Sequence, residues 1–146
     1  MLFRSIQSLY ILAVYQYIAF GNIVEATNNY NLAVAVKTEG TPMAGKTVVD
    51  FSISNKHTVA LTSDGQIYAW GRNESGQLGD GTNTASTLPV AVRTVGTPFA
   101  DKKAVQVVAG GWEGAHSLAL GTDGTVYSWG RSLNDQLGDQ TTNDTC

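Results

Sequence analysis

The 146-residue sequence has very little cysteine: one residue, Cys146, at the last position. A single thiol forms no internal disulfide bond and no cysteine metal cluster, so neither stabilises this fold. Only 14% of the residues are charged, the formal net charge is −3, and lysine and arginine form no run. Proteins that bind nucleic acid carry a basic stripe, and its absence argues against nucleic acid as a partner.

The composition that remains is apolar and rich in turn-forming residues, with 42% hydrophobic residues and 16 glycines. It is typical of a globular, β-rich chain rather than a disordered one. Residues 1–26 differ from the rest. They begin with Arg4, continue with the apolar stretch Leu9 to Phe20, and end in small residues up to Ala26. This order predicts a signal peptide, and hence a secreted or cell-surface protein.

Other interpretations of residues 1–26 stay open. The apolar stretch is shorter than the roughly 20 residues of a membrane-spanning helix, so a stable span is not expected. A membrane anchor and an incidental apolar tail, helical if it is not cleaved, remain alternatives. The corresponding alternative for localisation is the cytoplasm.

An internal repeat organises the rest of the chain. Residues 57–80 read HTVALTSDGQIYAWGRNESGQLGD, and residues 116–139 read HSLALGTDGTVYSWGRSLNDQLGD. Aligned without a gap, the two segments share 13 of 24 residues. Self-similarity at a fixed spacing indicates copies of one supersecondary unit. We assign residues 31–87 to a first repeat and residues 88–146 to a second, incomplete one.

Each repeat contains several short β-rich runs. Residues 32–36 and 88–92 predict one strand, and Pro89 predicts that its strand lies at a sheet edge. Residues 48–53 and 104–109 predict the next strand. The Asp-Gly pairs at Asp64 and Asp123 then predict hairpin turns, because glycine takes a positive φ without steric cost.

The strands of the hairpins are apolar on both faces, which predicts small sheets covered on both sides. Four-stranded sheets that stack on one another are the blades of a β-propeller. We therefore predict an all-β fold with two four-stranded antiparallel blades of an incomplete propeller, the second blade lacking a following strand. A propeller needs about 4 to 8 blades, so the blade faces of this chain are expected to promote self-association or to contact further blades.

The segment HTVALTSDGQIYAWGRNESGQLGDGT resembles the repeat of the regulator of chromosome condensation family, and the resemblance extends over residues 31–146. The second copy departs from the pattern in its exit loop, where Ser132, Asp135 and Gln140 replace Asn73, Gly76 and Gly81. The resemblance implies a seven-bladed propeller but no single activity. Members include a guanine-nucleotide exchange factor for a small GTPase, parts of ubiquitin ligases and a secreted β-lactamase inhibitor.

Two patterns could indicate chemistry, and we interpret both as structural. Residues 40–47, GTPMAGKT, match a phosphate-binding loop, but a strand pattern follows them instead of the helix that such a loop needs. His57 and His116 occupy equivalent positions with no third metal ligand at a defined spacing, so we expect a ring nitrogen to bond the backbone. We predict no catalytic residue, no cofactor and no metal.

The remaining candidates lie in loops, where binding residues are common. Arg72, Asn73, Trp112 and Arg131 form a predicted partner-binding loop set, since arginine and tryptophan are enriched at interaction hot spots. Asn73 and Asn143 begin N-glycosylation sequons. We predict a non-enzymatic protein-interaction module of a larger secreted or surface protein. The alternative is part of an exchange factor, or another regulator of a small GTPase, in the cytoplasm or nucleus.

Overall fold

The computed structural model describes residues 33–111, 116–140 and 143–144. The predicted apolar segment 1–26 and Trp112 therefore lie outside the described residues. The chain divides into two compact units, Met1–Ala35 and Val36–Cys146, and all the strands belong to the second. The described residues contain no helix, and so none that is long and apolar enough to cross a membrane.

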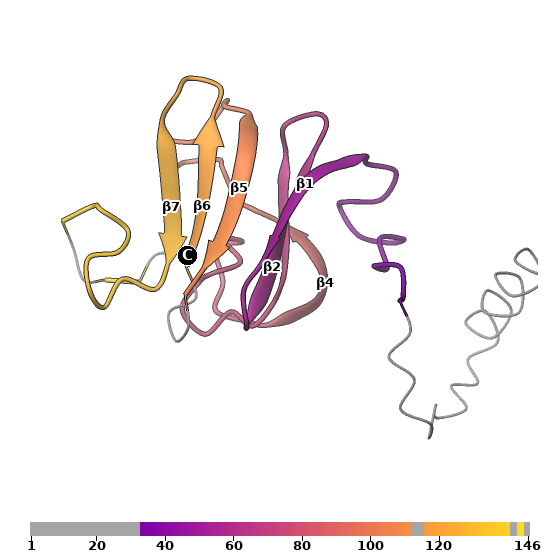
Figure 1. Ribbon diagram of the computed structural model, residues 1–146, viewed down its shortest axis with the longest axis horizontal. Helices are drawn as coiled ribbons and strands as arrows, with labels where there is room; N and C mark the ends of the chain where they lie inside the picture. Colours follow the sequence, from indigo (N-terminus) through magenta and orange to yellow (C-terminus); the bar gives the residue numbers. More distant parts are fainter. Residues whose placement is uncertain (1–32, 112–115, 141–142, 145–146) are drawn as a thin grey trace, which may run out of the picture. The chain divides into compact units, whose positions relative to one another are not determined.

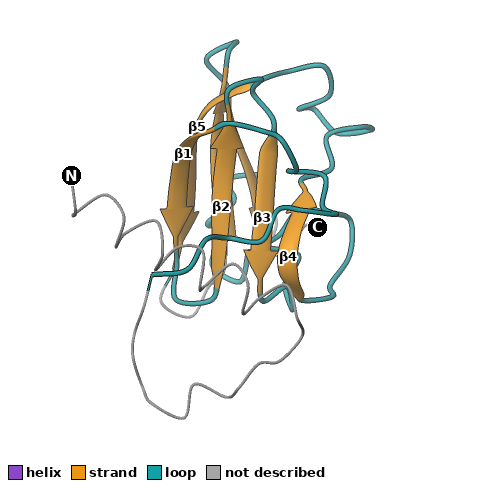
Figure 2. Cartoon of the chain, turned by 90° about the vertical axis from the view of Figure 1, so that its right-hand side faces the viewer, coloured by secondary structure: helices purple, strands orange, loops and turns teal. Residues whose placement is uncertain are grey.

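The described residues form seven strands in two antiparallel sheets (Figure 1). The first sheet has the order β1-β2-β3-β4, seen side by side in Figure 2, and the second has the order β5-β6-β7. We call them the first and the second blade. Their strands are β1 (Val48–Ile53), β2 (His57–Thr62), β3 (Ile67–Gly71), β4 (Ser86–Ala91), β5 (Ala104–Gly110), β6 (His116–Gly121) and β7 (Val126–Gly130).

The central hairpins form where the Asp-Gly pairs predicted them. Gly65 and Gly124 have φ values of +82° and +78°, which glycine adopts readily. In the first hairpin, the Thr62 amide donates to the Gln66 carbonyl at 3.0 Å. The predicted all-β fold of propeller blades is confirmed.

β4 confirms that the strand containing Pro89 lies at a sheet edge. It pairs with β3, aligning Ala69 with Val90 and Tyr68 with Ala91. The last strand of the first blade thus comes from residues that the sequence repeat assigns partly to the second copy. The repeat boundaries themselves remain a prediction.

The predicted strand at residues 32–36 is wrong for the part that is described. Ala33 to Val36 are irregular, and the Val34 side chain is 84% exposed. β4 is the counterpart of this segment one repeat later, and β4 is a strand because β3 provides its hydrogen bonds. No strand pairs with residues 33–36 in the described part of the chain, and β-structure depends on such a partner.

One hydrophobic core lies between the two blades, where β5 contacts β1 and β2. One face of each sheet contributes to it, with Val59, Leu61 and Leu78 from the first blade and Val107 and Trp129 from the second. The opposite face of the first blade has only a small cluster of Met43, Ala60, Tyr68 and Trp70. This face is largely open in the described part of the chain, where Phe51 on β1 is 63% exposed.

Candidate functional site

The first polar region is the exit loop, residues 72–85, which joins β3 to β4. The Asn73 side chain is completely buried at its centre. Its Nδ2 donates to Asp80 Oδ1 at 3.1 Å and to the Thr82 carbonyl at 2.8 Å. Its Oδ1 accepts the Leu78 amide at 2.9 Å. Both ends of the amide thus fix the loop backbone, so that Leu78 packs into the core between the blades.

The second polar region crosses from one blade to the other through His57, which is 3% exposed. The ring lies between two serines, with Nδ1 2.8 Å from Ser54 Oγ and Nε2 2.7 Å from Ser117 Oγ. The Ser117 hydroxyl donates to the Gln77 carbonyl at 2.9 Å. Since that proton is committed, Nε2 must donate to Ser117, and in the neutral ring this leaves Nδ1 as the acceptor that faces Ser54.

Burial and the neighbouring His116 lower the pKa of His57 to about 4. A neutral ring at physiological pH agrees with this hydrogen-bond pattern. The predicted structural role of His57 is supported, but its partners are side-chain hydroxyls rather than backbone groups. Sequence reasoning missed Ser117 because its pairing with His57 spans 60 positions.

The same Gln77 carbonyl also accepts the Trp129 indole N–H of the second blade at 3.0 Å. Gly79 makes this approach possible, since a Cβ there would lie 2.6 Å from Trp129 Nε1. The Gln77 side chain itself accepts the Ser75 amide at 2.9 Å. One carbonyl therefore receives two donors from the neighbouring blade.

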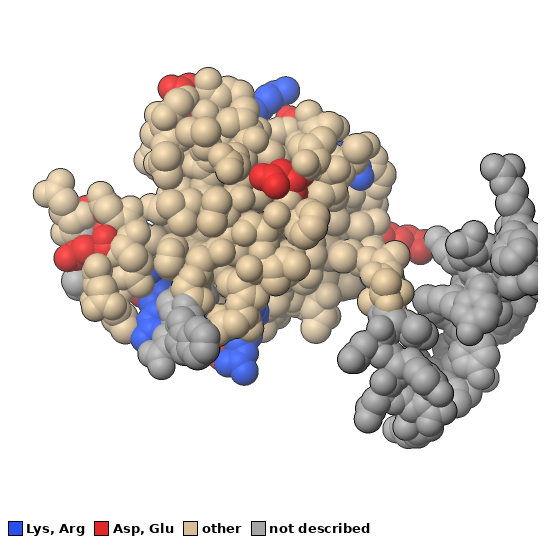
Figure 3. Space-filling view, in the orientation of Figure 1, with Lys and Arg blue, Asp and Glu red and all other residues tan. Residues whose placement is uncertain are grey.

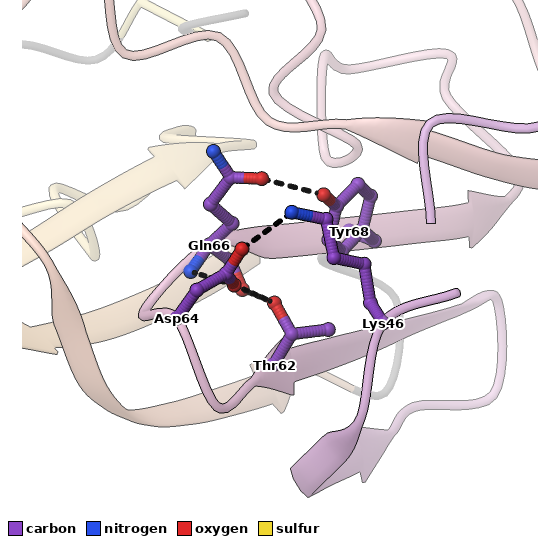
Figure 4. Close-up of polar contacts among 5 residues, drawn as sticks. All are labelled: Lys46, Thr62, Asp64, Gln66 and Tyr68. Carbon is purple, nitrogen blue, oxygen red and sulfur yellow. Dashed lines mark hydrogen bonds and ion pairs between the residues drawn. The ribbon is translucent and has the colours of Figure 1, made fainter. Parts of the chain in front are cut away.

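Lys46 belongs to the segment that matches a phosphate-binding loop, and here it forms an ion pair with Asp64 of the hairpin turn (Figure 4). The Lys46 ammonium and the Thr62 hydroxyl lower the pKa of Asp64 to about 2. β1 follows the loop, not a helix, and the Lys46 amide donates to the Met43 carbonyl instead of facing a phosphate. The structural interpretation of this motif is supported.

The second blade repeats this ion pair. Lys102 Nζ lies 3.3 Å from Asp123 Oδ2, and the Tyr127 hydroxyl donates to the same oxygen at 2.8 Å. Lys46 and Lys102 occupy equivalent positions in the spacer, as Asp64 and Asp123 do in the turns. The pair thus fastens each spacer to its hairpin, and its recurrence is the signal by which the sequence could have revealed it.

Two sequence models described as the regulator of chromosome condensation (RCC1) repeat match the chain, one at residues 64–120 and the other at residues 48–77. Together they cover residues 48–120, which are half of the sequence. The chain belongs to the RCC1 repeat family.

Relatives and solved structures agree with this assignment. The Arabidopsis thaliana ultraviolet-B receptor UVR8 is 46% identical over 83 residues, which are 57% of this chain and 17% of that protein. Human HERC3, a probable E3 ubiquitin-protein ligase, is 43% identical over 95 residues, which are 64% of this chain and 8% of that protein. The chain thus spans less than a fifth of the curated relatives that it matches here.

Human WBSCR16 has a similar structure with a TM-score of 0.57 and 26% identity, over 69% of this chain and 24% of that one. Prp20p of Saccharomyces cerevisiae, studied for its binding to Gsp1p and histones, has a TM-score of 0.58. At 23% identity, over 78% of this chain and 26% of that one, the likeness to Prp20p shows the fold alone.

The predicted partner-binding residues of the RCC1 repeats divide into different environments. The Arg72 side chain is 63% exposed, and its nearest charge is Glu74 at 3.8 Å. Arg131, its counterpart in the second repeat, is half-buried. Asn73 does not fit a partner-binding role or a glycan, because its amide nitrogen is buried and bonded inside the exit loop. Asn143 is exposed.

The two blades also enclose a groove of about 450 Å³ beside β7, lined among others by Val92, Phe99, Tyr127, Trp129 and Leu137. Its lining is largely apolar, with Arg93 and Asp139 as its charged residues. The described residues hold no group of three or more histidine, cysteine, aspartate or glutamate side chains able to bind a metal. The groove therefore offers packing surface rather than a set of reactive groups.

Proposed function

We propose that this chain is a non-enzymatic protein-interaction module, and that its partner binds at the end of the blades where β3 and β7 finish. The observation that carries the proposal is Arg72, an exposed guanidinium on a rigid support. Its amide donates to the Lys56 carbonyl at 2.9 Å, and the buried Asn73 follows directly. Because its backbone is already fixed, only the side chain loses conformational freedom on binding, which favours this arginine as an anchor.

Charge at this end points to the kind of partner. Figure 3 shows lysine and arginine side chains at the lower end of the molecule, where Figure 1 places the β1–β2 loop. Arg131 follows β7 at the corresponding position in the second blade. Two guanidinium groups in equivalent positions suit a protein surface that presents carboxylates.

The test is affinity capture from the cells of origin, with the partners identified by mass spectrometry. We expect the double variant Arg72→Glu and Arg131→Glu to lose the main partner at least tenfold, since it places like charges against carboxylates. Lys103→Glu is the control, because it makes the charge change of one of these substitutions at an exposed lysine beside the hairpin turn. Equal capture by all three proteins would overturn the proposal.

Two further proposals need separate tests. Export from the cell rests on residues 1–26, and the mass of the mature chain tests it: we expect a start at Thr27 and glycan at Asn143 but not at Asn73. Regulation of a small GTPase stays an alternative prediction, and release of a fluorescent guanine nucleotide from such a GTPase tests it directly.

A further inference from the structure

The β1–β2 loop, residues 54–56, supports the arginine that we propose as the partner anchor. The Arg72 amide donates to the Lys56 carbonyl at 2.9 Å. Gly71 packs directly on the same loop, since a Cβ there would lie 2.6 Å from the Lys56 carbonyl oxygen and 2.8 Å from His57 Cα. The position of the Arg72 backbone therefore depends on the conformation of the β1–β2 loop.

One hydroxyl group holds this loop together. Ser54 Oγ accepts the Lys56 amide at 3.1 Å and the His57 amide at 3.0 Å. A hydroxyl oxygen has two acceptor positions and one proton, so these two bonds occupy both acceptor positions. The hydroxyl proton remains for His57 Nδ1, which lies 2.8 Å from Ser54 Oγ. The arrangement is complete only while Nδ1 carries no proton of its own.

The His57 ring can take up a proton at one nitrogen only. Nε2 already donates to Ser117, because the Ser117 hydroxyl donates to the Gln77 carbonyl. An added proton therefore enters at Nδ1 and turns it into a donor that faces Ser54 Oγ. Three N–H groups then compete for two acceptor positions. One amide of the β1–β2 loop must lose its hydrogen bond, which loosens the loop.

The surroundings of His57 do not offset a positive charge on its ring. Among the described residues beside it, the titratable or charged ones are His116 of β6, Lys56 of the β1–β2 loop and Arg72 after β3. The exit loop contributes Gln77, which is uncharged. Burial and His116 lower the pKa of His57 to about 4. A protonated ring is thus disfavoured in the closed loop, and a fall in pH favours an open loop in which water reaches the ring.

We propose that His57 is a pH switch for the partner site at Arg72. The neutral ring keeps the β1–β2 loop closed and Arg72 in place, and the protonated ring opens the loop and frees Arg72 from its support. His57 is a positioning residue in this scheme, because its ring contacts the loop and not the partner. The switch itself depends only on the chain, whereas its consequence, release of the partner in acid, rests on the proposed function.

Hydrogen exchange of the Arg72 amide, followed by NMR, measures the open loop directly, because that amide is bonded to Lys56 in the closed loop. The pKa of His57 is about 4 in the closed loop and returns to 6.5 in the open one, so the ratio of open to closed rises about twentyfold from pH 7 to pH 5. We expect this rise in the native chain after correction for the intrinsic exchange rate. Exchange that does not respond to pH would overturn the switch.

His57→Gln is the first variant. A glutamine amide can donate to Ser117 and accept from Ser54, but it does not titrate, so we expect the ratio to rise by less than about twofold over the same pH range. The Ser63 amide is the internal control, because it donates to the Thr47 carbonyl at 2.8 Å at the opposite end of the first blade. An equal rise at Ser63 would assign the exchange to unfolding of the whole blade and contradict the proposal.

Ser54→Ala tests the hydroxyl group without a change of pH. It removes the acceptor of both loop amides, so we expect the Arg72 amide to exchange about tenfold faster than in the native chain at pH 7. Retained protection of the Ser63 amide would show that the blade is still folded. Slow exchange of the Arg72 amide in such a folded variant would overturn the link between Ser54 and Arg72.

The consequence for binding is tested with the protein that the native chain captures at pH 7 and that mass spectrometry identifies. At pH 5 we expect its release from the immobilised native chain to be about tenfold faster than from His57→Gln, and at pH 7 we expect equal rates. Equal release at pH 5, although the Arg72 amide responds to pH, would overturn Arg72 as the anchor. Absence of the exchange response would overturn the switch and leave the proposed function standing.

Discussion

The two blades have nearly the same backbone but achieve it with different residues. Three non-glycine residues have a positive φ in the described chain: Asp101 at 61°, Asp135 at 57° and Gln140 at 63°. All three belong to the second copy, and they stand where the first copy has Gly45, Gly76 and Gly81, with φ between 71° and 82°. The fold thus imposes the conformation, and the second blade adopts it with residues that are strained there.

A second difference concerns burial. The second blade covers the face of the first blade on which Leu78 lies, and Leu78 is completely buried there. The equivalent Leu137 is 8% exposed and lines the groove beside β7. The comparison shows that equivalent residues of two repeats can contribute differently to stability, because the neighbouring blade covers one of them more completely.

The largest expected effect tests this difference directly. Leu78→Ala removes a side chain from the core between the blades and is expected to reduce the free energy of unfolding by about 3 kcal/mol. Leu137→Ala is expected to reduce it by about half as much, because the groove already exposes part of that site to water. Urea denaturation at low protein concentration measures both, and equal losses would show that the blades are equally covered.

The next effect concerns the exit loop, where the second copy has Ser132 in place of Asn73. Asn73→Ser is expected to lower the free energy of unfolding by about 2 kcal/mol, since serine cannot bond both the Leu78 amide and the Thr82 carbonyl. Asn83→Ser, at an exposed asparagine of the same loop, is the control and is expected to change little. Similar losses of stability for both variants would show that Asn73 stabilises the loop no more than an exposed asparagine does.

A third prediction uses pH, because His57 is buried. Its pKa is about 4 in the folded chain and near 6.5 when unfolded, so the unfolded state binds the proton first as the pH falls. Stability is therefore complete above pH 6.5 and decreases between pH 6.5 and 4. We expect the melting temperature to fall over this window, and the fall to be smaller in His57→Gln. An unchanged pH dependence in the variant would assign it to other groups.

The smallest expected effect concerns the strained turns. Gln140→Gly is expected to raise the free energy of unfolding by about 1 kcal/mol, because glycine adopts a positive φ without strain. The reverse exchange, Gly81→Gln, is expected to lower it by a similar amount. Thermal melts of the two variants would move in opposite directions, and movement in the same direction would mean that side-chain contacts decide the outcome.

Much of the fold was predictable because its signals are local. The Asp-Gly turns, the apolar hairpins and the edge position of Pro89 each follow from a few neighbouring residues. Residues 33–36 show the limit, since a strand needs a partner that composition does not reveal. Which face of each sheet is covered was equally hard to predict, because both faces of each hairpin are apolar and only packing distinguishes Val107 from Phe51.

The polar site was predictable in part. Arg72 was correctly placed in an exposed loop. Asn73 was misread as a surface residue, although its loss from the divergent second exit loop already linked it to loop geometry. The contact of His57 with Ser117 depends on how two sheets stack, which no local pattern encodes.

Ser117 and Trp129 of the second blade donate hydrogen bonds to one acceptor of the first blade, the main-chain carbonyl of Gln77. No amino-acid exchange at that position can delete a backbone oxygen, whereas single codon changes can remove the donors at Ser117 and Trp129. The acceptor of these two hydrogen bonds therefore cannot be removed by a substitution. A repeat can lose one donor, retain the other on the same oxygen, and regain the lost one later. This gives duplicated blades room to diverge in sequence while they continue to recognise their neighbours.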